Sequence, residues 1–314
     1  MQPLHILTWH VHGSYLYYLS QVPHIFYLPV KPDHSEGYGG RLPGYPWPDN
    51  VRDVPAEEVK NLKLDCILYQ SARNYQEDRQ AILSSDQRRL PAVYLEHDPP
   101  RQHPTDTRHI VDDAAMLLVH VTYFNALMWD NGSTPTRVVE HGVIVPEDTV
   151  YCGDLNRGIS VVNGLYRRGR RLGADVFDRA RTYIPLDLVG MESEKVGGLG
   201  AVPHGELLPL AARYRFFFNP IRYTSLGLAV CEAMMIGMPI IGLATTEMAT
   251  IIENEVSGYV HTDPDQLLAY MQELLADPVL AHQLSIGARR QALERFHIRR
   301  FVDDWLETFR MVTG

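Results

Sequence analysis

A loop and helix start near residue 225 carry the residues best suited to phosphate chemistry. An apolar run at 216–219 is followed by small and polar residues and then by an apolar helical pattern, after which Gly-Met-Pro at 237–239 precedes another apolar run. Backbone N–H groups at 225–228 would point out of the helix start, where the helix dipole adds roughly half a positive charge. Glu232 lies about one turn further in and could accept hydrogen bonds from ribose hydroxyls. Ordinary packing of a βα turn would produce the same pattern.

Four arginines gather at a second predicted strand-to-helix turn, after an apolar run at 159–165. Guanidinium groups bind phosphate oxygens through paired hydrogen bonds. A leaving nucleoside diphosphate needs such cations where protein carboxylates hold no metal. A solvated basic helix start would contain the same residue types. The four are Arg167, Arg168, Arg170 and Arg171.

Histidine is concentrated in the first half of the chain, where ten of the fourteen precede residue 150. His10 and His12 follow the first apolar run, and some barrel hydrolases begin a metal site with such a His-x-His. The other ligands would be His97, His120 or His141. A (β/α)₈ barrel usually needs about 250 residues with ligands continuing into its later strands. Because no such ligands follow His141, a metal-dependent hydrolase is the weaker alternative.

Apolar runs alternate with amphipathic segments through most of the chain, which predicts an α/β protein with parallel sheets. The interval 31–50 breaks this rhythm with many prolines and glycines and is expected to form a long binding loop or a disordered one. Tyr38, Tyr45 and Trp47 in it could stack on a sugar. Strands are expected in the first half at 4–9, 24–30, 64–70, 91–97, 116–121 and 137–143.

A second series of strands and helices follows an aperiodic segment at 144–157, where we expect the domain boundary. Asp263 is a candidate N-cap before Pro264 and a long helical pattern. The predicted domains are 1–150 on the acceptor side, 151–296 for the nucleotide-sugar and a C-terminal helix at 297–314 that returns to the first domain. Strands are expected at 159–165, 186–190, 216–219, 239–243 and 258–261.

Composition narrows the classes of function. A formal net charge of −9 supplies no basic field for a nucleic-acid backbone. Cys66, Cys152 and Cys231 are odd in number and far apart, unlike a secreted disulfide scaffold. The first apolar run has no basic leader and no stretch of about 18 apolar residues, so we expect neither a signal peptide nor a membrane span. These features predict a cytoplasmic protein and leave peripheral membrane contact open.

The segment from Asn219 to Leu243 reads Asn-Pro-Ile-Arg-Tyr-Thr-Ser-Leu-Gly-Leu-Ala-Val-Cys-Glu-Ala-Met-Met-Ile-Gly-Met-Pro-Ile-Ile-Gly-Leu. It resembles the retaining GT-B glycosyltransferases of family four, whose signature here is roughly Glu-Gly-Phe-Gly-Leu-x-x-x-Glu-Ala-Met-Ala-x-Gly-x-Pro-Val-Val. The resemblance continues through 247–260. It implies a GT-B fold, in which two Rossmann-like, doubly wound parallel-sheet domains face a cleft and ligands bind at the carboxyl ends of the strands.

The resemblance also implies the donor site. Glu232 corresponds to the second glutamate of the family's E-x7-E pair, which binds the donor ribose. Thr224 stands in place of the first glutamate, which lies near the donor sugar in the family, so the sugar is left open. The predicted diphosphate contacts and helix start are Ser225, Leu226, Gly227 and Leu228.

The family's phosphate-neutralising arginine and lysine have no direct counterparts. Gly164 stands in the arginine's place and no lysine follows. We predict Arg168 and Arg170 as replacements, because they lie at the same strand-to-helix turn.

In the first half the resemblance rests on strand-end motifs. Many family members have a histidine at the end of the equivalent strand, close to the donor sugar and the acceptor, which predicts His97 as the catalytic residue. Gly13 resembles the glycine after the first strand, where a missing side chain lets the backbone approach the ligand. Thr122 is expected to cap a helix that family members usually cap with Ser, and Glu140-His-Gly-Val143 resembles their Asn-Gly-Val before the linker.

The implied activity is transfer of a sugar from a nucleotide-sugar to an unknown acceptor, whether a saccharide, a lipid-linked acceptor or a small molecule. Retention without a protein-bound metal is expected, and the donor is a substrate, so no separate cofactor is expected. Because Thr224 and Gly164 replace two family residues, a non-catalytic nucleotide-sugar-binding relative or partner subunit is the alternative.

Overall fold

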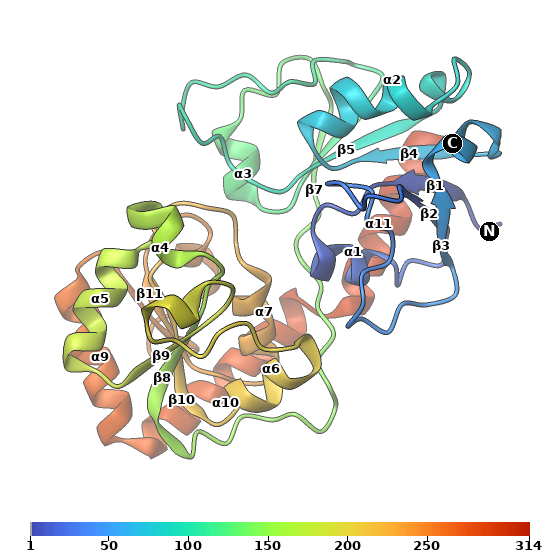
Figure 1. The fold of residues 1–314 in the computed structure, drawn as a ribbon. Coiled ribbons are helices and arrows are strands. Elements are labelled where there is room, and N and C mark those ends of the chain that lie inside the picture. Colours follow the sequence, from blue (N-terminus) through green and yellow to red (C-terminus); the bar gives the residue numbers. More distant parts are fainter. Residues whose placement is uncertain (1) are drawn as a thin grey trace. The chain divides into compact units, whose positions relative to one another are not determined.

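The computed structural model describes residues 2–314, which divide into two compact units (Figure 1). The first unit contains the chain up to Gly142 together with Ile298–Gly314, and the second unit is Val143–His297. Each unit has its own parallel sheet. In the described part of the chain, no helix is long and apolar enough to cross a membrane.

The sheet of the first unit has seven parallel strands in the order β3-β2-β1-β4-β5-β6-β7. The strand order reverses between β1 and β4, and ligands of open α/β sheets bind outside the carboxyl ends of strands at such a point. The strands are β1 (His5–Thr8), β2 (Ile25–Val30), β3 (Val51–Pro55), β4 (Cys66–Tyr69), β5 (Ala92–Glu96), β6 (Leu117–His120) and β7 (Thr136–Val138).

Helices cover both faces of this sheet. On one face the ring of Trp305 in α11 donates a hydrogen bond from Nε1 to the Tyr15 hydroxyl in α1, at 3.2 Å. Phe309, one turn further along α11, packs against Phe26 of β2. Thr122 caps α3 as predicted, accepting a hydrogen bond from the Asn125 amide. The helical segments are α1 (Gly13–Leu19), η1 (Ala56–Asn61), η2 (Asn74–Asp78), α2 (Arg79–Ile82), η3 (Gln87–Arg89), α3 (Tyr123–Met128) and α11 (Ile298–Thr313).

The interval 31–50 is an ordered loop that folds back on the sheet, with isolated bridges joining Gly37 to His10 and Gly39 to Val30. Tyr38 is fully buried and donates a hydrogen bond to Asp78, so the expectation that it stacks on a sugar is wrong. Tyr45 and Trp47 remain half-buried. The loop leads into β3, an edge strand that the sequence pattern missed because Arg52 and Asp53 interrupt its apolar residues.

The sheet of the second unit has five parallel strands in the order β12-β11-β10-β8-β9, which reverses between β8 and β10. The first strand begins earlier than the predicted 159–165 and ends at Val161, because the chain turns at Gly164, whose φ is 59°. The strands are β8 (Leu155–Val161), β9 (Leu186–Val189), β10 (Tyr214–Asn219), β11 (Ile240–Leu243) and β12 (Gly258–His261).

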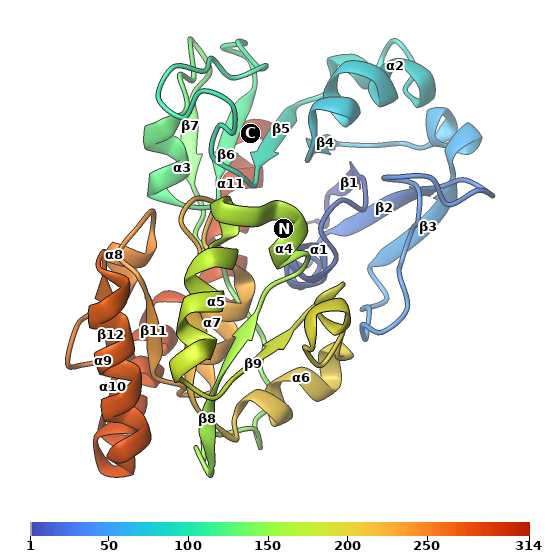
Figure 2. The same ribbon diagram turned by 60° about the vertical axis from the view of Figure 1, so that its left-hand side comes forward.

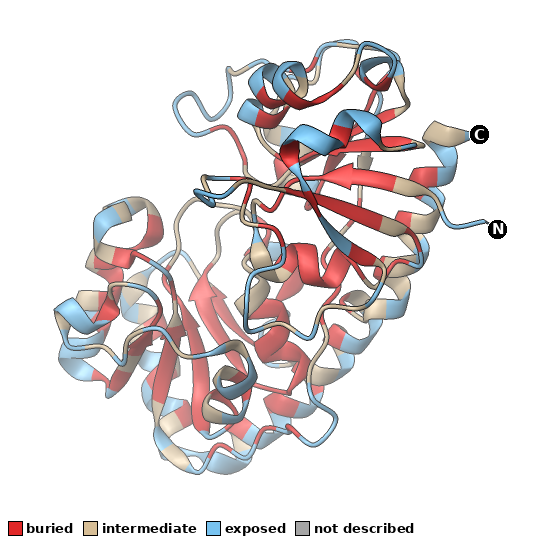
Figure 3. Cartoon of the chain, turned by 45° about the vertical axis from the view of Figure 1, so that its right-hand side comes forward, coloured by how far each residue is buried: buried red, intermediate tan, exposed pale blue. Residues whose placement is uncertain are grey.

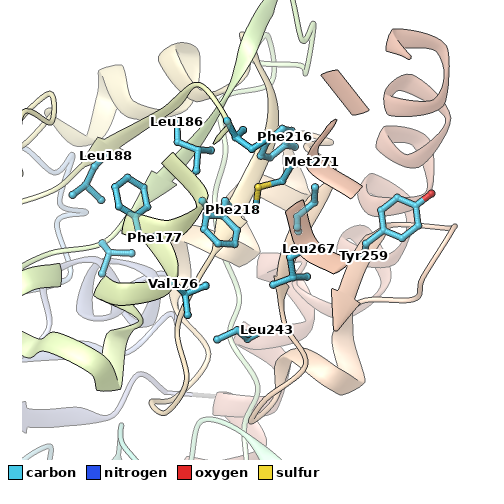
Figure 4. Packing of buried hydrophobic residues seen from close by; sticks show 14 of the residues in the cluster. Val176, Phe177, Leu186, Leu188, Phe216, Phe218, Leu243, Tyr259, Leu267 and Met271 are labelled. Carbon is cyan, nitrogen blue, oxygen red and sulfur yellow. The ribbon is translucent and has the colours of Figure 1, made fainter. Parts of the chain in front are cut away.

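Alternation along β10 builds the core of this unit. Phe216 and Phe218 point to one face, where they join Phe177 of α5 and Met271 of α9 in one buried cluster (Figure 4). Figure 3 shows how fully the strands are buried. Burying one such side chain contributes about 1.5–3 kcal/mol. The helical segments are α4 (Leu165–Arg168), η4 (Gly169–Leu172), α5 (Ala174–Tyr183), η5 (Ser193–Val196), α6 (His204–Ala211), α7 (Leu228–Met235), α8 (Met248–Ile251), α9 (Pro264–Ala276) and α10 (Pro278–Arg295).

The start of α9 is capped as the sequence predicts. The Asp263 carboxylate accepts a hydrogen bond from the Asp265 amide at 2.9 Å, and Pro264 is the first helical residue. Proline is tolerated there because the first helical N–H has no intrahelical partner.

Gly258 at the start of β12 is a sensitive point of the second sheet. Its φ is 153°, and a Cβ placed on it would lie 1.9 Å from the Ile240 carbonyl oxygen. We predict that Gly258→Ala lowers the free energy of unfolding by at least about 1–3 kcal/mol, the usual range for a strained backbone. Gly205→Ala is the matched control, because no atom lies within 4 Å of the added Cβ. Equal melting temperatures for the two variants in calorimetry would contradict the prediction.

Candidate functional site

The reversal point of the second sheet places the predicted phosphate-binding residues at the start of α7. Gly227, the N-cap residue, has extended backbone with φ −76° and ψ 138°, and as a glycine it has no side chain with which to cap the helix. Its carbonyl oxygen accepts a hydrogen bond from the Val230 amide at 3.0 Å. Thr224, Ser225, Gly227 and Leu228 are half-buried and Leu226 is buried. This arrangement suits an anion, because the first helical N–H groups carry partial positive charge.

Glu232 lies on the second turn of α7 and is only 4% exposed. Carboxylates are rarely buried to this degree unless they are paired. A carboxylate behind a helix start can accept hydrogen bonds from hydroxyls, and the binding of ribose by Glu232 stays a prediction.

The loop before α7 is held against the loop that follows β8. The carbonyl oxygen of Arg171 accepts hydrogen bonds from the amides of both Arg222 and Tyr223, each at 3.1 Å. Gly173 has φ 81°, and a Cβ there would lie 1.8 Å from the Pro220 carbonyl oxygen. Only glycine permits this approach, so the two loops form one surface at the carboxyl ends of β8 and β10.

A partly exposed ion pair between Arg222 and Asp175 joins the same two loops. The Arg222 guanidinium donates to both oxygens of the Asp175 carboxylate, at 2.5 and 2.7 Å. The pKa of that carboxyl is held below its usual value, chiefly by Arg222. Arg170 also donates to Asp175, at 2.6 Å. Arg170 and Arg222 therefore both bond the Asp175 carboxylate. The Arg170 side chain is more exposed than that of Arg222 or Asp175.

The four predicted arginines differ in what they contact. The Arg167 guanidinium forms an ion pair with the Glu192 carboxylate at 3.0 Å. Arg170 forms one with Asp175 at 2.6 Å. Arg168 is half-buried at the end of α4. Arg171 is half-buried, and within residues 2–314 no carboxylate forms an ion pair with its guanidinium. Hydrogen bonds therefore hold the Arg171 backbone in place, while its guanidinium has no carboxylate partner in the described part of the chain.

A cavity of about 210 Å³ lies between the start of α4 and the segment that follows β9. Leu165 and Leu188 supply apolar surface, and Arg167, Glu192 and Lys195 supply charge. Gly164 also lines it, and its left-handed backbone would be strained by the arginine that family members have there.

In the first unit, His97 follows β5 and is fixed by a side chain on the loop after β4. The Gln70 amide donates to the Thr8 hydroxyl at 2.8 Å and to the Trp9 carbonyl at 2.9 Å, which leaves its oxygen to face His97 Nε2 at 3.1 Å. Nε2 must therefore carry the proton and donate. His97 Nδ1 keeps a lone pair, which is the group available for a substrate hydroxyl.

Aromatic rings surround His97 closely. Its ring centroid lies 4.2 Å from that of His12 and 4.9 Å from that of Tyr15, both in edge-on geometry. Burial, then the neighbouring His12 and His141, hold the pKa of His97 well below its usual value. The imidazole is thus neutral near pH 7, and it can accept a hydrogen bond or a proton at Nδ1.

Gly13 is the first residue of α1, directly after the loop that follows β1. A Cβ at this position would lie 3.3 Å from His10 Nε2 and 3.5 Å from the Tyr45 hydroxyl. A side chain at this position would press on His10 and Tyr45, so glycine suits the packing here, and its contact with a ligand stays a prediction.

The geometry does not support the metal-dependent hydrolase. Two open sheets replace the barrel that this alternative requires. Within residues 2–314 no three His, Cys, Asp or Glu side chains come together in a metal-binding group. His120 instead bonds Asn131 through Nε2 at 2.9 Å, and burial lowers its pKa to about 4.

Sequence reasoning missed three residues that shape these sites. Gln70 was signalled only as a polar residue at the end of an apolar run, whereas His97 was identified through the resemblance to family members with a histidine at that strand end. Asp175 and Arg222 gave no local signal, because they are 47 positions apart in the chain. Arg171 was recognised as one of four arginines, but its lack of a carboxylate partner depends on tertiary contacts.

Comparison with known families identifies the second unit's central segment. Residues 180–277, which include β10, α7 and Glu232, match the family model described as glycosyl transferases group 1. This match confirms the predicted glycosyltransferase character of the segment. No curated protein matches the chain in sequence.

Solved structures resemble the chain over its whole length. Sucrose-phosphate synthase from Thermosynechococcus elongatus has a TM-score of 0.69 at 15% identity, covering 99% of each chain. A glycosyltransferase from Rickettsia africae ESF-5 has a TM-score of 0.71 at 12% identity, also covering 99% of each chain. Anabaena HepE in complex with UDP has a TM-score of 0.68 at 13% identity, covering 99% of this chain and 100% of that one. The predicted fold class, GT-B with two Rossmann-like sheets, is confirmed.

The hydrogen bond to Gln70 leads to a prediction for His97. Nitrogen NMR of histidine-labelled protein should show His97 neutral, with the proton on Nε2, at pH 8 and still at pH 6. The folded pKa lies below the unfolded value of about 6.5, so stability is lost as pH falls below that value because the unfolded state binds the proton first. His97→Gln should lose less stability over the same range. A titration midpoint at or above the usual value would contradict this prediction.

Proposed function

We propose that this protein transfers a sugar from a nucleoside-diphosphate sugar to an acceptor molecule. The observation that carries the proposal is the site at the reversal point of the second sheet, where the loop that contains Arg171 is hydrogen-bonded to the loop leading into α7, the helix that carries the buried Glu232. This site falls largely within the residues that match glycosyl transferases group 1. A uridine nucleotide is the first candidate, because the similar HepE structure contains UDP.

In this proposal the α7 start and the arginines hold the diphosphate. Thr224, Ser225, Leu226, Gly227 and Leu228 would surround it from the helix side, and Glu232 would bind the ribose. Among the arginines we favour Arg171 together with Arg168, because the guanidinium of Arg170 already bonds Asp175. Arginines supply the positive charge that a leaving diphosphate needs without a protein-bound metal.

We further propose that His97 acts on the transferred sugar with Gly13 nearby in the same unit, and that the reaction proceeds with retention. A neutral imidazole with its lone pair on Nδ1 can accept a hydrogen bond from a sugar hydroxyl or from the reacting face. Gln70 would be a positioning residue, since it fixes the tautomer rather than contacting the sugar.

A non-catalytic nucleotide-sugar-binding protein is the second candidate. It is favoured by Gly164, whose left-handed backbone would strain the family's arginine, and by Thr224 in place of a glutamate. Tight binding of a nucleotide-sugar without transfer or donor hydrolysis, measured over a panel of UDP-, GDP- and ADP-sugars, would identify this alternative.

The first prediction of the proposal concerns nucleotide affinity. Glu232→Gln should weaken UDP binding, measured by calorimetry, because a hydrogen bond from a charged group is lost. Such a loss costs about 1.5–3 kcal/mol, which corresponds to roughly 10- to 150-fold in affinity. Unchanged affinity would remove Glu232 from the site.

A matched pair of arginine variants tests the phosphate assignment. Arg171→Ala should weaken UDP binding about 10-fold or more, as expected for a lost charge-assisted hydrogen bond. Arg170→Ala should change the affinity by less than about threefold, because its guanidinium is already bonded to Asp175. The reverse order would overturn the choice of Arg171.

The third prediction of the proposal separates the role of His97 in turnover from that of Glu232 in nucleotide binding. His97→Ala should lower kcat by about 10²-fold with little change in the dissociation constant of UDP, since the lost contact is made chiefly in the transition state. Glu232→Gln should instead act mainly on nucleotide binding. Wild-type kcat in folded His97→Ala protein would mean that His97 only ties β5 to the following loop.

A further inference from the structure

A cavity of about 500 Å³ lies beside the edge strand β3, where the loop that follows β2 turns back on the first sheet. Small-molecule sites usually have such a volume and combine apolar walls with a few placed polar groups. Four charged side chains line this cavity. Its apolar surface comes from Val30, Pro32 and Pro55. None of the lining residues belongs to the sites described above.

The loop at 31–41, which forms one side of the cavity, is held by its own backbone. Gly39 forms an isolated bridge with Val30, and the Lys31 amide donates to the Tyr38 carbonyl oxygen at 3.2 Å. His34 also lines the cavity and has φ 47°, a strained conformation for a residue with a side chain. Such strain is concentrated at sites that hold ligands. The cavity is therefore preformed, which reduces the entropy that binding costs.

Two of the four charges are paired with each other. The Asp53 carboxylate accepts hydrogen bonds from the Arg41 backbone amide at 2.9 Å and from Arg41 Nε at 3.2 Å. This ion pair adds no net charge to the cavity.

The other two charges, those of Lys31 and Glu57, have opposite sign and are not joined. Lys31 Nζ lies over the Tyr38 ring, 3.6 Å from its centroid, a contact that holds the ammonium group without neutralising it. Glu57 is exposed in the first turn of η1. Within residues 2–314 neither Nζ nor this carboxylate forms an ion pair or a hydrogen bond. The cavity therefore presents a positive and a negative group that lie apart.

This charge arrangement selects the class of ligand. A phosphate or carboxylate alone would be attracted by Lys31 and repelled by Glu57, and a simple amine would meet the reverse. A molecule with both charges can pair its carboxylate with Lys31 and its ammonium group with Glu57. Its apolar body would then contact Val30, Pro32 and Pro55. Complementary charges of this kind give specificity.

We propose that the cavity binds a small zwitterion of the amino acid or dipeptide class, with Lys31 on the carboxylate and Glu57 on the ammonium group. The site belongs to the first unit alone. The inference goes beyond the proposed sugar transfer and does not rest on it.

Calorimetry with L-leucine, glycyl-L-leucine and 5-aminovalerate tests the proposal over different spacings of the two charges. Each probe is compared with one analogue that lacks the ammonium group and one that lacks the carboxylate. For leucine these are 4-methylpentanoate and 3-methylbutylamine. At least one zwitterion should bind about 10-fold more tightly or better than both of its analogues, because each analogue loses one charged hydrogen bond. The same zwitterion should shift the Gly39 amide resonance saturably.

Variants of the two charged residues assign their roles. Lys31→Met and Glu57→Gln should each weaken binding of that zwitterion about 10-fold. In Glu57→Gln the zwitterion should bind no more tightly than the analogue without an ammonium group, a result that a merely structural role would not produce. Glu58→Gln and Lys60→Met are matched controls, because both residues are exposed on η1 outside the cavity lining. Both controls should bind as wild type does.

The proposal is overturned if no zwitterion binds more tightly than both of its analogues. It is equally overturned if folded Lys31→Met and Glu57→Gln proteins bind the zwitterion with wild-type affinity.

Discussion

The close approach of two loops in the second unit is the constraint on which the proposed donor site depends. Gly173 lies against the Pro220 carbonyl so tightly that no other residue fits, and the Arg171 carbonyl accepts hydrogen bonds from two successive amides of the facing loop. The bidentate pair between Arg222 and Asp175 closes the same contact. These interactions hold the arginine-containing loop after β8 against the loop that leads into α7, although Arg170 and Arg222 are 52 positions apart in the sequence.

In the first unit, hydrogen bonds that involve backbone carbonyls determine which ring nitrogen of His97 and of His10 carries the proton. Gln70 is oriented by the Trp9 carbonyl and so fixes the proton of His97 on Nε2. The Gly40 carbonyl fixes the proton of His10 on Nδ1. Burial lowers the pKa of both rings, so both are neutral near pH 7. The lone pair of His97 suits a hydroxyl group, whereas the second unit presents the cations and helix start that suit a diphosphate.

Much of the fold could be predicted because parallel strands in α/β proteins are short apolar runs. The strand beginning at Leu186 and the capped helix from Pro264 follow directly from such local patterns. The edge strand β3 was missed because its buried residues, Val51 and Val54, are separated by the exposed Arg52 and Asp53, which leaves no apolar run. The loop at 31–50 was recognised, but only tertiary contacts bury Tyr38 and leave Trp47 half-buried.

The candidate site was predictable to the extent that it is local in sequence. Residues 224–228 and Glu232 belong to one strand-turn-helix unit, so their spacing alone brings them together. The choice among Arg167, Arg168, Arg170 and Arg171 was not predictable, because distant partners such as Asp175 and Glu192 engage two of them. Histidine tautomers were equally inaccessible, since they depend on hydrogen bonds across 27 and 30 positions.

Hydrogen exchange with and without saturating UDP tests the central claim most directly, because it locates the nucleotide without any substitution. The account predicts slowed exchange in peptides covering 162–173 and 219–232, where the two joined loops and the start of α7 would bind the diphosphate and ribose. Bound UDP that leaves these peptides unchanged, or that protects only peptides within residues 2–142, would contradict the account.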